Sequence, residues 1–135
     1  MALQYSTTHR TNAMTDIANQ ASTSALLRIW AGTIPVNCGT ADTGTLLATL
    51  TCNVSGLGTA TSGVLTFNAI TSATAVAGGT ATYFRIHPSA ATSTNAVLQG
   101  VVATSGGDLN LNTTTISSGL TVAVTNFATI TAFGA

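Results

Sequence analysis

The sequence predicts a mainly β protein: a jelly-roll-like antiparallel β-sandwich with one N-terminal helix. Three observations support this. Apolar and polar residues alternate along most of the chain after residue 25. Thr, Val, Ile and aromatic residues, which suit pleated strands, fill the alternating segments. Clusters rich in Gly, Ser, Thr and Asn separate these segments, as in all-β domains with many short strands. The 135 residues fit one domain, which we divide into an N-terminal arm and helix (1–24) and a β-sandwich domain (25–135).

Residues 7–24 form the one segment with a convincing helical period. Apolar side chains recur there at the i, i+3, i+4 and i+7 positions, namely Met14, Ile17, Ala18 and Ala21. Thr7 or Thr8 can cap the start of this helix. The apolar stripe is thin, so we expect the helix to pack against something larger. Residues 1–24 are therefore the first candidate for an arm that docks on a neighbouring protein.

The remaining chain follows a period of two. Expected strands lie at 26–31, 46–54, 63–70, 80–87, 95–103, 107–111 and 119–133. Turn clusters separate them, including 55–63, 71–79 and 115–119. In the last expected strand, the apolar residues change from even-numbered to odd-numbered positions near Thr125–Asn126. A β-bulge at that point, or burial of both faces, would explain the change.

The chain is exceptionally poor in charge. Only 4% of its residues are charged, against about 25% in an ordinary globular domain. The charged residues are Arg10, Arg28, Arg85, Asp16, Asp42 and Asp108, with no Lys and no Glu. Zero net charge promotes association, whereas three scattered Arg residues cannot form the basic patch that nucleic-acid binding requires. No apolar run approaches the ~18–20 residues that span a bilayer, so we expect neither a nucleic-acid nor a membrane partner.

Catalytic and metal-binding patterns are weak. The segment 108-DLNLN-112 resembles the opening of a calcium loop, but Thr113 and Gly119 stand where that loop needs Gly and Glu. His9 and His87 belong to no known arrangement with a nucleophile, and three widely spaced Asp residues make a carboxylate pair improbable. We expect a protein that is not an enzyme, with no catalytic residues, no cofactor and no metal.

The two cysteines, Cys38 and Cys52, permit a disulfide. Two cysteines without a visible secretory signal are more often small buried thiols. We favour the thiols and keep the disulfide as the alternative.

Large side chains with both polar and apolar parts gather on one expected face. If Leu27 and Ile29 face the core, Arg28 and Trp30 share the opposite face. Residues 83–87 alternate in the same way. Arg, Trp and Tyr are enriched in protein–protein contacts, although an Arg can also cover an aromatic ring of its own chain. Burial of the sheet on both faces would remove this assignment. The candidate partner-interface residues are Met14, Ile17, Arg28, Trp30, Tyr83, Arg85 and His87.

Several blocks resemble a group of small virion proteins of tailed bacteriophages. These blocks are 3-LQYSTTHRTNAMTDIANQ-20, 79-GTATYFRIHPSA-90, 97-VLQGVV-102 and 107-GDLNLNTTTISSGLTVAV-124. The resemblance implies a capsid decoration or cement protein, a jelly-roll-like viral structural protein that binds the outside of the head. Its partners would be the major capsid protein and its own copies, as a homodimer or homotrimer. It would be made in the bacterial host cytoplasm and reside on the capsid surface of the virion.

A surface with few charges fits this role, because burying it against other proteins costs little desolvation energy. Two alternatives remain open. The chain could be a tail, collar or head-fibre component of the virion. It could also be a carbohydrate-binding β-sandwich, although one Trp and two Tyr provide few of the exposed aromatics that such a module needs.

Overall fold

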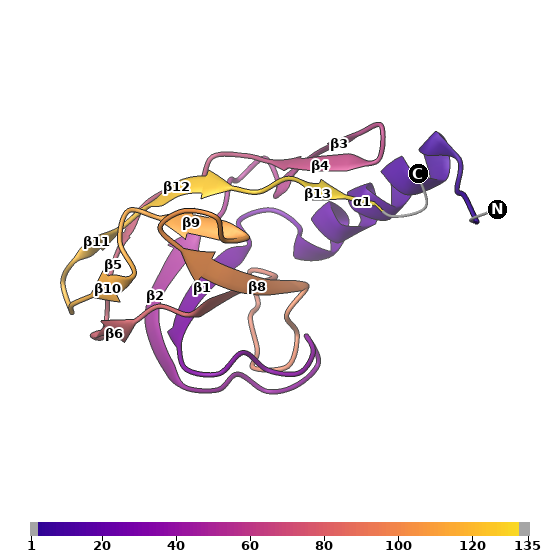
Figure 1. Cartoon of the computed structure of the whole chain (residues 1–135). Coiled ribbons are helices and arrows are strands. Elements are labelled where there is room, and N and C mark those ends of the chain that lie inside the picture. The colour runs from indigo at the N-terminus through magenta and orange to yellow at the C-terminus, as the bar shows by residue number, and fades with distance from the viewer. Residues whose placement is uncertain (1–2, 133–135) are drawn as a thin grey trace.

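The structure is a computed structural model that describes residues 3–132. It confirms a mainly β protein with one N-terminal helix (Figure 1). The helix α1 spans Thr7–Ala21, and its N-cap is Ser6, whose side chain accepts a hydrogen bond of 3.1 Å from the N–H of His9. The predicted N-cap, Thr7 or Thr8, thus lies one or two residues after the observed one. The helix ends before residue 24 because Ser22 adopts a left-handed φ of 63°.

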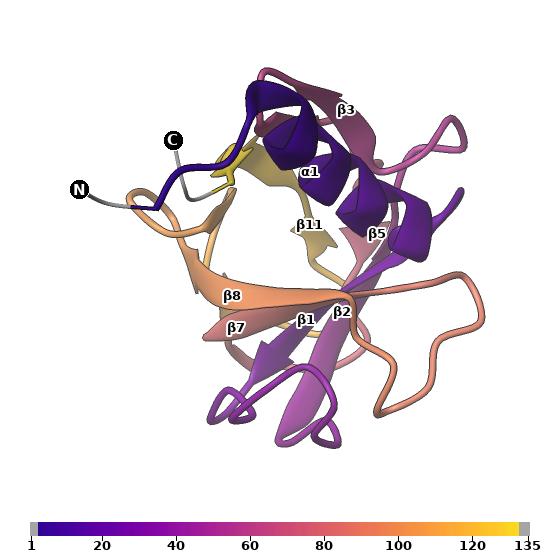
Figure 2. The ribbon, with the colours of Figure 1, turned by 90° about the vertical axis from the view of Figure 1, so that its right-hand side faces the viewer.

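Six strands form the largest sheet. They are β1 (Leu26–Ala31), β2 (Thr45–Thr51), β7 (Tyr83–His87), β8 (Leu98–Ala103), β9 (Leu109–Leu111) and β12 (Val124–Phe127). Their order is β12-β9-β8-β7-β1-β2, and the sheet curls into a half-barrel (Figures 1 and 2). This architecture is not clearly a jelly roll.

The sheet is mixed, which corrects the expectation of a wholly antiparallel arrangement. Strands β8 and β9 run parallel, with Val102 opposite Leu109. A glycine allows the tight connection between them: a Cβ at Gly107 would lie 2.9 Å from the backbone nitrogen of Ala103. The chain can therefore fold back beside the end of β8 within a few residues.

Short strands form three smaller sheets. One contains β3 (Gly58–Thr61), β4 (Val64–Phe67) and β13 (Ile130–Thr131). The other two pair β5 (Ala73–Thr74) with β11 (Thr121–Val122) and β6 (Gly79–Thr80) with β10 (Thr115–Ile116). Strands β3, β5 and β10 lie in segments that we predicted as turns, as does Gly79, the first of the two residues of β6. Each of these short strands is paired with a partner that the sequence pattern does not reveal.

The predicted bulge in the last long strand is confirmed. The pairing of β12 with β9 shifts its register between Val124 and Asn126. Beyond the bulge, Phe127 stacks on Phe67 with ring centroids 3.8 Å apart, and meets Phe84 edge-on at 5.2 Å. The bulge therefore helps to place Phe127 between the large sheet and β4.

The helix packs against its own chain. Met14 is buried with Leu65 and Ala132 in a small apolar cluster, and the partly buried Ile17 packs against the same cluster. The hydroxyl of Thr11 also accepts a hydrogen bond from the N–H of Gly63, at 2.9 Å. The thin apolar stripe of α1 is thus used within the chain. Figure 2 shows α1 lying beside β3. Docking of residues 1–24 on a neighbour stays a prediction.

Candidate functional site

The polar side chains predicted to share one face of the large sheet do so. Arg28 of β1 lies opposite Arg85 of β7, and Trp30 lies opposite Tyr83. This outer face is covered by two segments, 32–44 and 88–97, which we call the covering loops. All five residues of β7 are buried, so in the single chain most of this face is not open to a partner.

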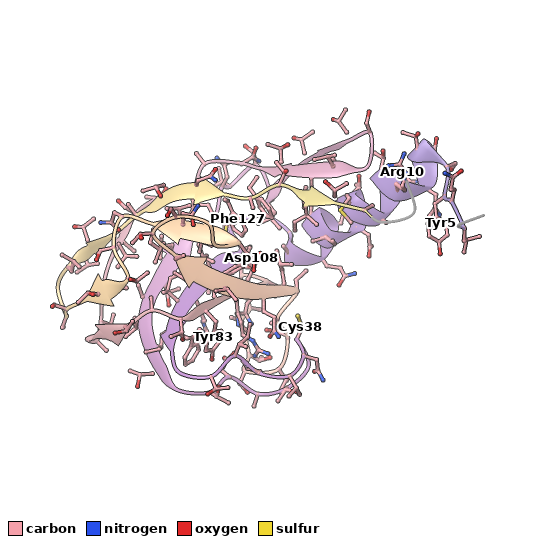
Figure 3. The ribbon with its side chains drawn as sticks, viewed as in Figure 1. Tyr5, Arg10, Cys38, Tyr83, Asp108 and Phe127 are labelled. Carbon is pink, nitrogen blue, oxygen red and sulfur yellow. The ribbon has the colours of Figure 1, made fainter. Side chains whose placement is uncertain are left out.

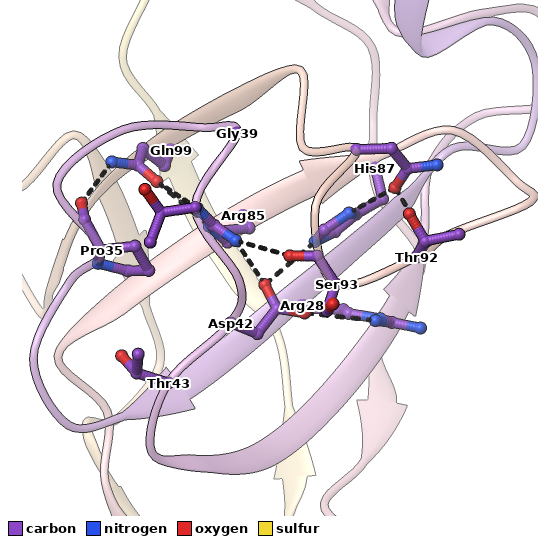
Figure 4. A network of polar contacts seen from close by, with 12 residues as sticks. Arg28, Pro35, Gly39, Asp42, Thr43, Arg85, His87, Thr92, Ser93 and Gln99 are labelled. Carbon is purple, nitrogen blue, oxygen red and sulfur yellow. Dashed lines mark hydrogen bonds and ion pairs between the residues drawn. The ribbon is translucent and has the colours of Figure 1, made fainter.

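Arg85 is the centre of the site beneath the covering loops and is fully buried. Its Nη1 group donates to Oδ1 of Asp42 at 2.6 Å and to the carbonyl of Ser93 at 3.2 Å. Its Nη2 group donates to the carbonyl of Asn37 at 2.8 Å and to Oε1 of Gln99 at 2.9 Å, and Nε donates to the same Oε1 at 3.1 Å. All five N–H donors of the guanidinium are therefore satisfied (Figure 4).

Asp42 is the carboxylate that balances these positive charges. Its side chain is 7% exposed, and Arg28 Nη1 lies 3.7 Å from its Oδ2 atom. The Nε2 atom of His87 lies 3.7 Å from Oδ1. The backbone N–H of Asp42 donates to the carbonyl of Ser93 at 3.1 Å. Through Asp42 and Arg85, the two covering loops are bonded both to the strands and to each other.

His87 is buried and is held from the second covering loop. Its Nδ1 lies 3.0 Å from Oδ1 of Asn95, and the amide of Asn95 donates to the carbonyl of Ala90 at 2.9 Å. This places the imidazole proton on Nδ1 and leaves Nε2 without a hydrogen-bond partner. Burial lowers the pKa of His87, and Arg28 and Arg85 add to this, against the opposing effects of Asn95 and Asp42.

An aromatic pair occupies the other end of the same face. The rings of Trp30 and Tyr83 are nearly parallel, at 6°, with centroids 6.2 Å apart. The hydroxyl of Tyr83 donates to the carbonyl of Thr43 and accepts from the N–H of Thr43. Trp30 is 9% exposed and Tyr83 is 1% exposed. The aromatic pair thus helps to fasten the first covering loop.

Sequence reasoning found the cations of this site but not their partners. Asp42, Asn95 and Gln99 were not predicted to act together with Arg85. One signal could have revealed the carboxylate partner: Arg85 lies between Phe84 and Ile86 in an expected strand. A buried cation requires a carboxylate nearby, and the chain has only three Asp side chains and no Glu.

Most polar groups of this arrangement are engaged with one another or with backbone carbonyls. All N–H donors of the Arg85 guanidinium have partners, and the Asp42 carboxylate is engaged by Arg85 and flanked by Arg28.

No group of three or more His, Cys, Asp or Glu residues that could hold a metal ion occurs within residues 3–132. In the same part of the chain, no helix has the length and apolar character needed to cross a membrane. The outer surface of the covering loops carries Val36, which is 89% exposed.

The two cysteines are both free thiols, and they differ in burial. Cys38 is partly exposed in the first covering loop. Cys52 is buried in the main apolar core, and burial raises its pKa to about 11. Of the two small buried thiols that we expected, Cys52 alone is buried.

Comparisons of the chain with protein-family models, with curated proteins and with solved structures find no match.

Proposed function

We propose that this chain is a non-enzymatic structural protein of a tailed-bacteriophage virion. It is a capsid decoration or cement protein that binds the outside of the head, as a homodimer or homotrimer, and stabilises contacts between major capsid subunits. It is made in the bacterial host cytoplasm and resides on the capsid surface. One observation carries the proposal. In a nearly uncharged chain, four of the few ionisable side chains lie beneath the covering loops and hold them in place, namely Arg28, Asp42, Arg85 and His87.

Fixing these loops prepares them for binding. A loop that is ordered before association loses less conformational entropy on binding. An outer surface with few charges also loses little solvation energy when another protein covers it. Both properties suit permanent packing against a shell, where many copies of a modest contact act together and raise the free energy needed to disrupt the particle.

As part of this proposal, we interpret the fold as a jelly-roll-like sandwich. The half-barrel and the sheet of β3, β4 and β13 would be the two layers of a sandwich around the apolar core. The exposed side chain of Val36 marks the surface of the first covering loop that would meet the capsid.

Copy number tests the proposal. Quantitative mass spectrometry of purified particles should give hundreds of copies per head for a decoration protein, and about a dozen for a collar component, because a closed ring fixes the smaller number. A count near a dozen would favour the tail, collar or head-fibre alternative. A chain absent from purified particles would refute both.

A second measurement locates the contact. Val36→Asp places a charge on the covering loop, and we expect it to lower capsid occupancy. Val76→Asp is the matched control, since Val76 is also well exposed, at 68%, but lies outside the covering loops. Equal loss of occupancy in both variants would argue against the covering loops as the contact surface.

The carbohydrate-binding alternative receives no support from the aromatic pair. Such modules stack sugars on exposed rings, and Trp30 and Tyr83 are covered. Binding of the purified protein to a glycan array would revive this alternative.

A further inference from the structure

The imidazole of His87 lies where the two covering loops meet the large sheet, and it is fully buried. Its Nδ1–H group is directed at Oδ1 of Asn95 in the second loop, at 3.0 Å. Its Nε2 atom has no hydrogen-bond partner and lies 3.7 Å from Oδ1 of Asp42 in the first loop. A further proton would therefore be added at Nε2, the atom that faces Asp42.

The charges around this imidazole are already unbalanced. Arg28 of β1 and Arg85 of β7 both lie against one carboxylate, that of Asp42. These three are the charged side chains that act on His87. Asn95, which faces the ring from the second loop, is uncharged. Two cations thus stand against one anion while His87 is neutral, and a protonated His87 would be the third cation.

The Asp42 carboxylate is already engaged where a third cation would meet it. Its Oδ1 atom, which lies nearest to Nε2, accepts a hydrogen bond of 2.6 Å from Nη1 of Arg85. A protonated Nε2 would compete with Arg85 for this oxygen, and excess positive charge is costly in a buried cluster. Burial is also the main cause that lowers the pKa of His87. The closed arrangement therefore binds the proton less readily than an open, hydrated one.

The same cluster fastens the covering loops over an aromatic surface. The N–H of Asp42 donates to the carbonyl of Ser93 at 3.1 Å and so joins one loop to the other. Beneath the loops lie the stacked rings of Trp30 and Tyr83. Figure 3 shows Tyr83 on the side of the large sheet where the first covering loop, marked by Cys38, lies. Loss of the fastening would uncover these rings, while the apolar core on the other face of the sheet stays packed.

We propose that His87 is an acid-sensitive switch: its protonation releases the covering loops and uncovers the face of Trp30 and Tyr83, with the rest of the fold intact. The switch goes beyond the function proposed above and does not depend on it, because it involves only groups of this chain. The face that opens carries Arg, Trp and Tyr side chains, which are enriched in protein–protein contacts. The chain thus covers at neutral pH a surface that acid makes available.

Amide hydrogen exchange of the whole chain tests the switch. The quantity to follow is the protection factor, the intrinsic exchange rate divided by the observed rate, because it corrects for the ordinary effect of pH on exchange. Between about pH 7.5 and about pH 5, where a histidine titrates, we expect the protection of the Asp42 N–H to fall about tenfold, while amides of β3 and β4 change little. An equal fall in both regions, or no fall at Asp42, would overturn the proposal.

Two variants assign the effect to this imidazole. His87→Gln keeps an amide donor for Asn95 but takes up no proton, so the Asp42 amide should stay protected at both pH values. His9→Gln removes the other histidine, which is exposed on α1, and should leave the acid response unchanged. An acid response that survives in His87→Gln, or that is lost in His9→Gln, would overturn the proposal.

A second readout uses the unaltered protein and so does not depend on the folding of a variant. NMR of the His87 ring gives the pH at which the ring is protonated. Acrylamide quenching of the fluorescence of Trp30, the only Trp in the chain, gives the pH at which the covered face opens. The two midpoints should coincide. Quenching that stays unchanged while the ring is protonated, or a midpoint apart from that of His87, would overturn the proposal.

Discussion

The two faces of β7 are equally buried but are built from opposite chemistry. Phe84 and Ile86 point into the apolar core, whereas Tyr83, Arg85 and His87 point into the polar network beneath the covering loops. Apolar packing is non-directional, so the inner face can adapt to small changes in shape. The outer face depends on fixed hydrogen bonds in a low-dielectric environment, where one missing partner leaves another group unsatisfied. We therefore expect the outer face to be the more sensitive to single substitutions, and to transmit their effects to the loops.

The largest expected effect comes from removing the central cation. Arg85→Met should lower the free energy of unfolding by about 3–5 kcal/mol, because it leaves the Asp42 carboxylate buried without its closest partner. Urea denaturation measures this change. In the double variant with Asp42→Asn, the loss should be smaller than the sum of the two single losses. Additive losses would show that the two side chains do not act as a pair.

Gly44, at the end of the first covering loop, should be nearly as sensitive. It has a φ of +82°, and a Cβ there would overlap the carbonyl oxygen of Ala31. We expect Gly44→Ala to cost about 3 kcal/mol, through backbone strain and steric overlap. Gly119→Ala is the matched control, because Gly119 has a similar φ of +87° with no atom within 4 Å of its Cβ position. It should cost only about 1–2 kcal/mol, as measured by the same denaturation experiment. Equal losses would show that the overlap at Gly44 is relieved at no cost.

A conservative change on the inner face should have a smaller effect. Ile86→Val removes one methylene from the core and should lower the free energy of unfolding by about 0.5–1.5 kcal/mol. Hydrogen exchange in the covering loops should not change. Loop exchange that rises as much as in Arg85→Met would show that the two faces of β7 are not independent.

Acid should weaken the outer face through His87. The pKa of His87 is lowered in the folded protein from its ordinary value near 6.5, so the unfolded chain binds the proton more readily. Its contribution to stability is complete above about pH 6.5 and is lost as the pH falls from there toward the folded pKa. Denaturation at several pH values should show this decline, and His87→Gln should flatten it. An unchanged slope in His87→Gln would assign the decline to other groups.

The smallest effect concerns the two thiols. Cys38, in the first covering loop, should react with iodoacetamide in the folded protein. Cys52 should not react, because it is buried and its raised pKa keeps it protonated. Mass spectrometry of the folded and the urea-unfolded protein measures both rates. Fast reaction of Cys52 in the folded protein would contradict the packing of the core.

The features that the sequence predicted are those with a local cause. The alternation of residues 26–31 and 83–87 predicted which side chains share the outer face, and a change of parity predicted the bulge near Asn126. These patterns depend on the period of a strand, which neighbouring residues reveal. The thin helix was predicted on the same basis.

The covering loops could not be predicted in this way. Arg85 finds Asp42 43 residues away and Gln99 14 residues away, and no periodicity links these positions. The first loop also provides backbone carbonyls, such as that of Asn37, which carry no sequence signal. For the same reason, the outer face was expected to be open to partners, whereas the chain itself covers it.

The central claim is that the buried network of Arg85 and Asp42 holds the covering loops in place, and amide hydrogen exchange tests it most directly. In the unaltered protein, the N–H of Asp42, which donates to Ser93, should exchange slowly. In Arg85→Met, it should exchange at least tenfold faster, while amides of β3 and β4 keep their relative protection. Rapid exchange at Asp42 in the unaltered protein, or no change in Arg85→Met, would contradict the account.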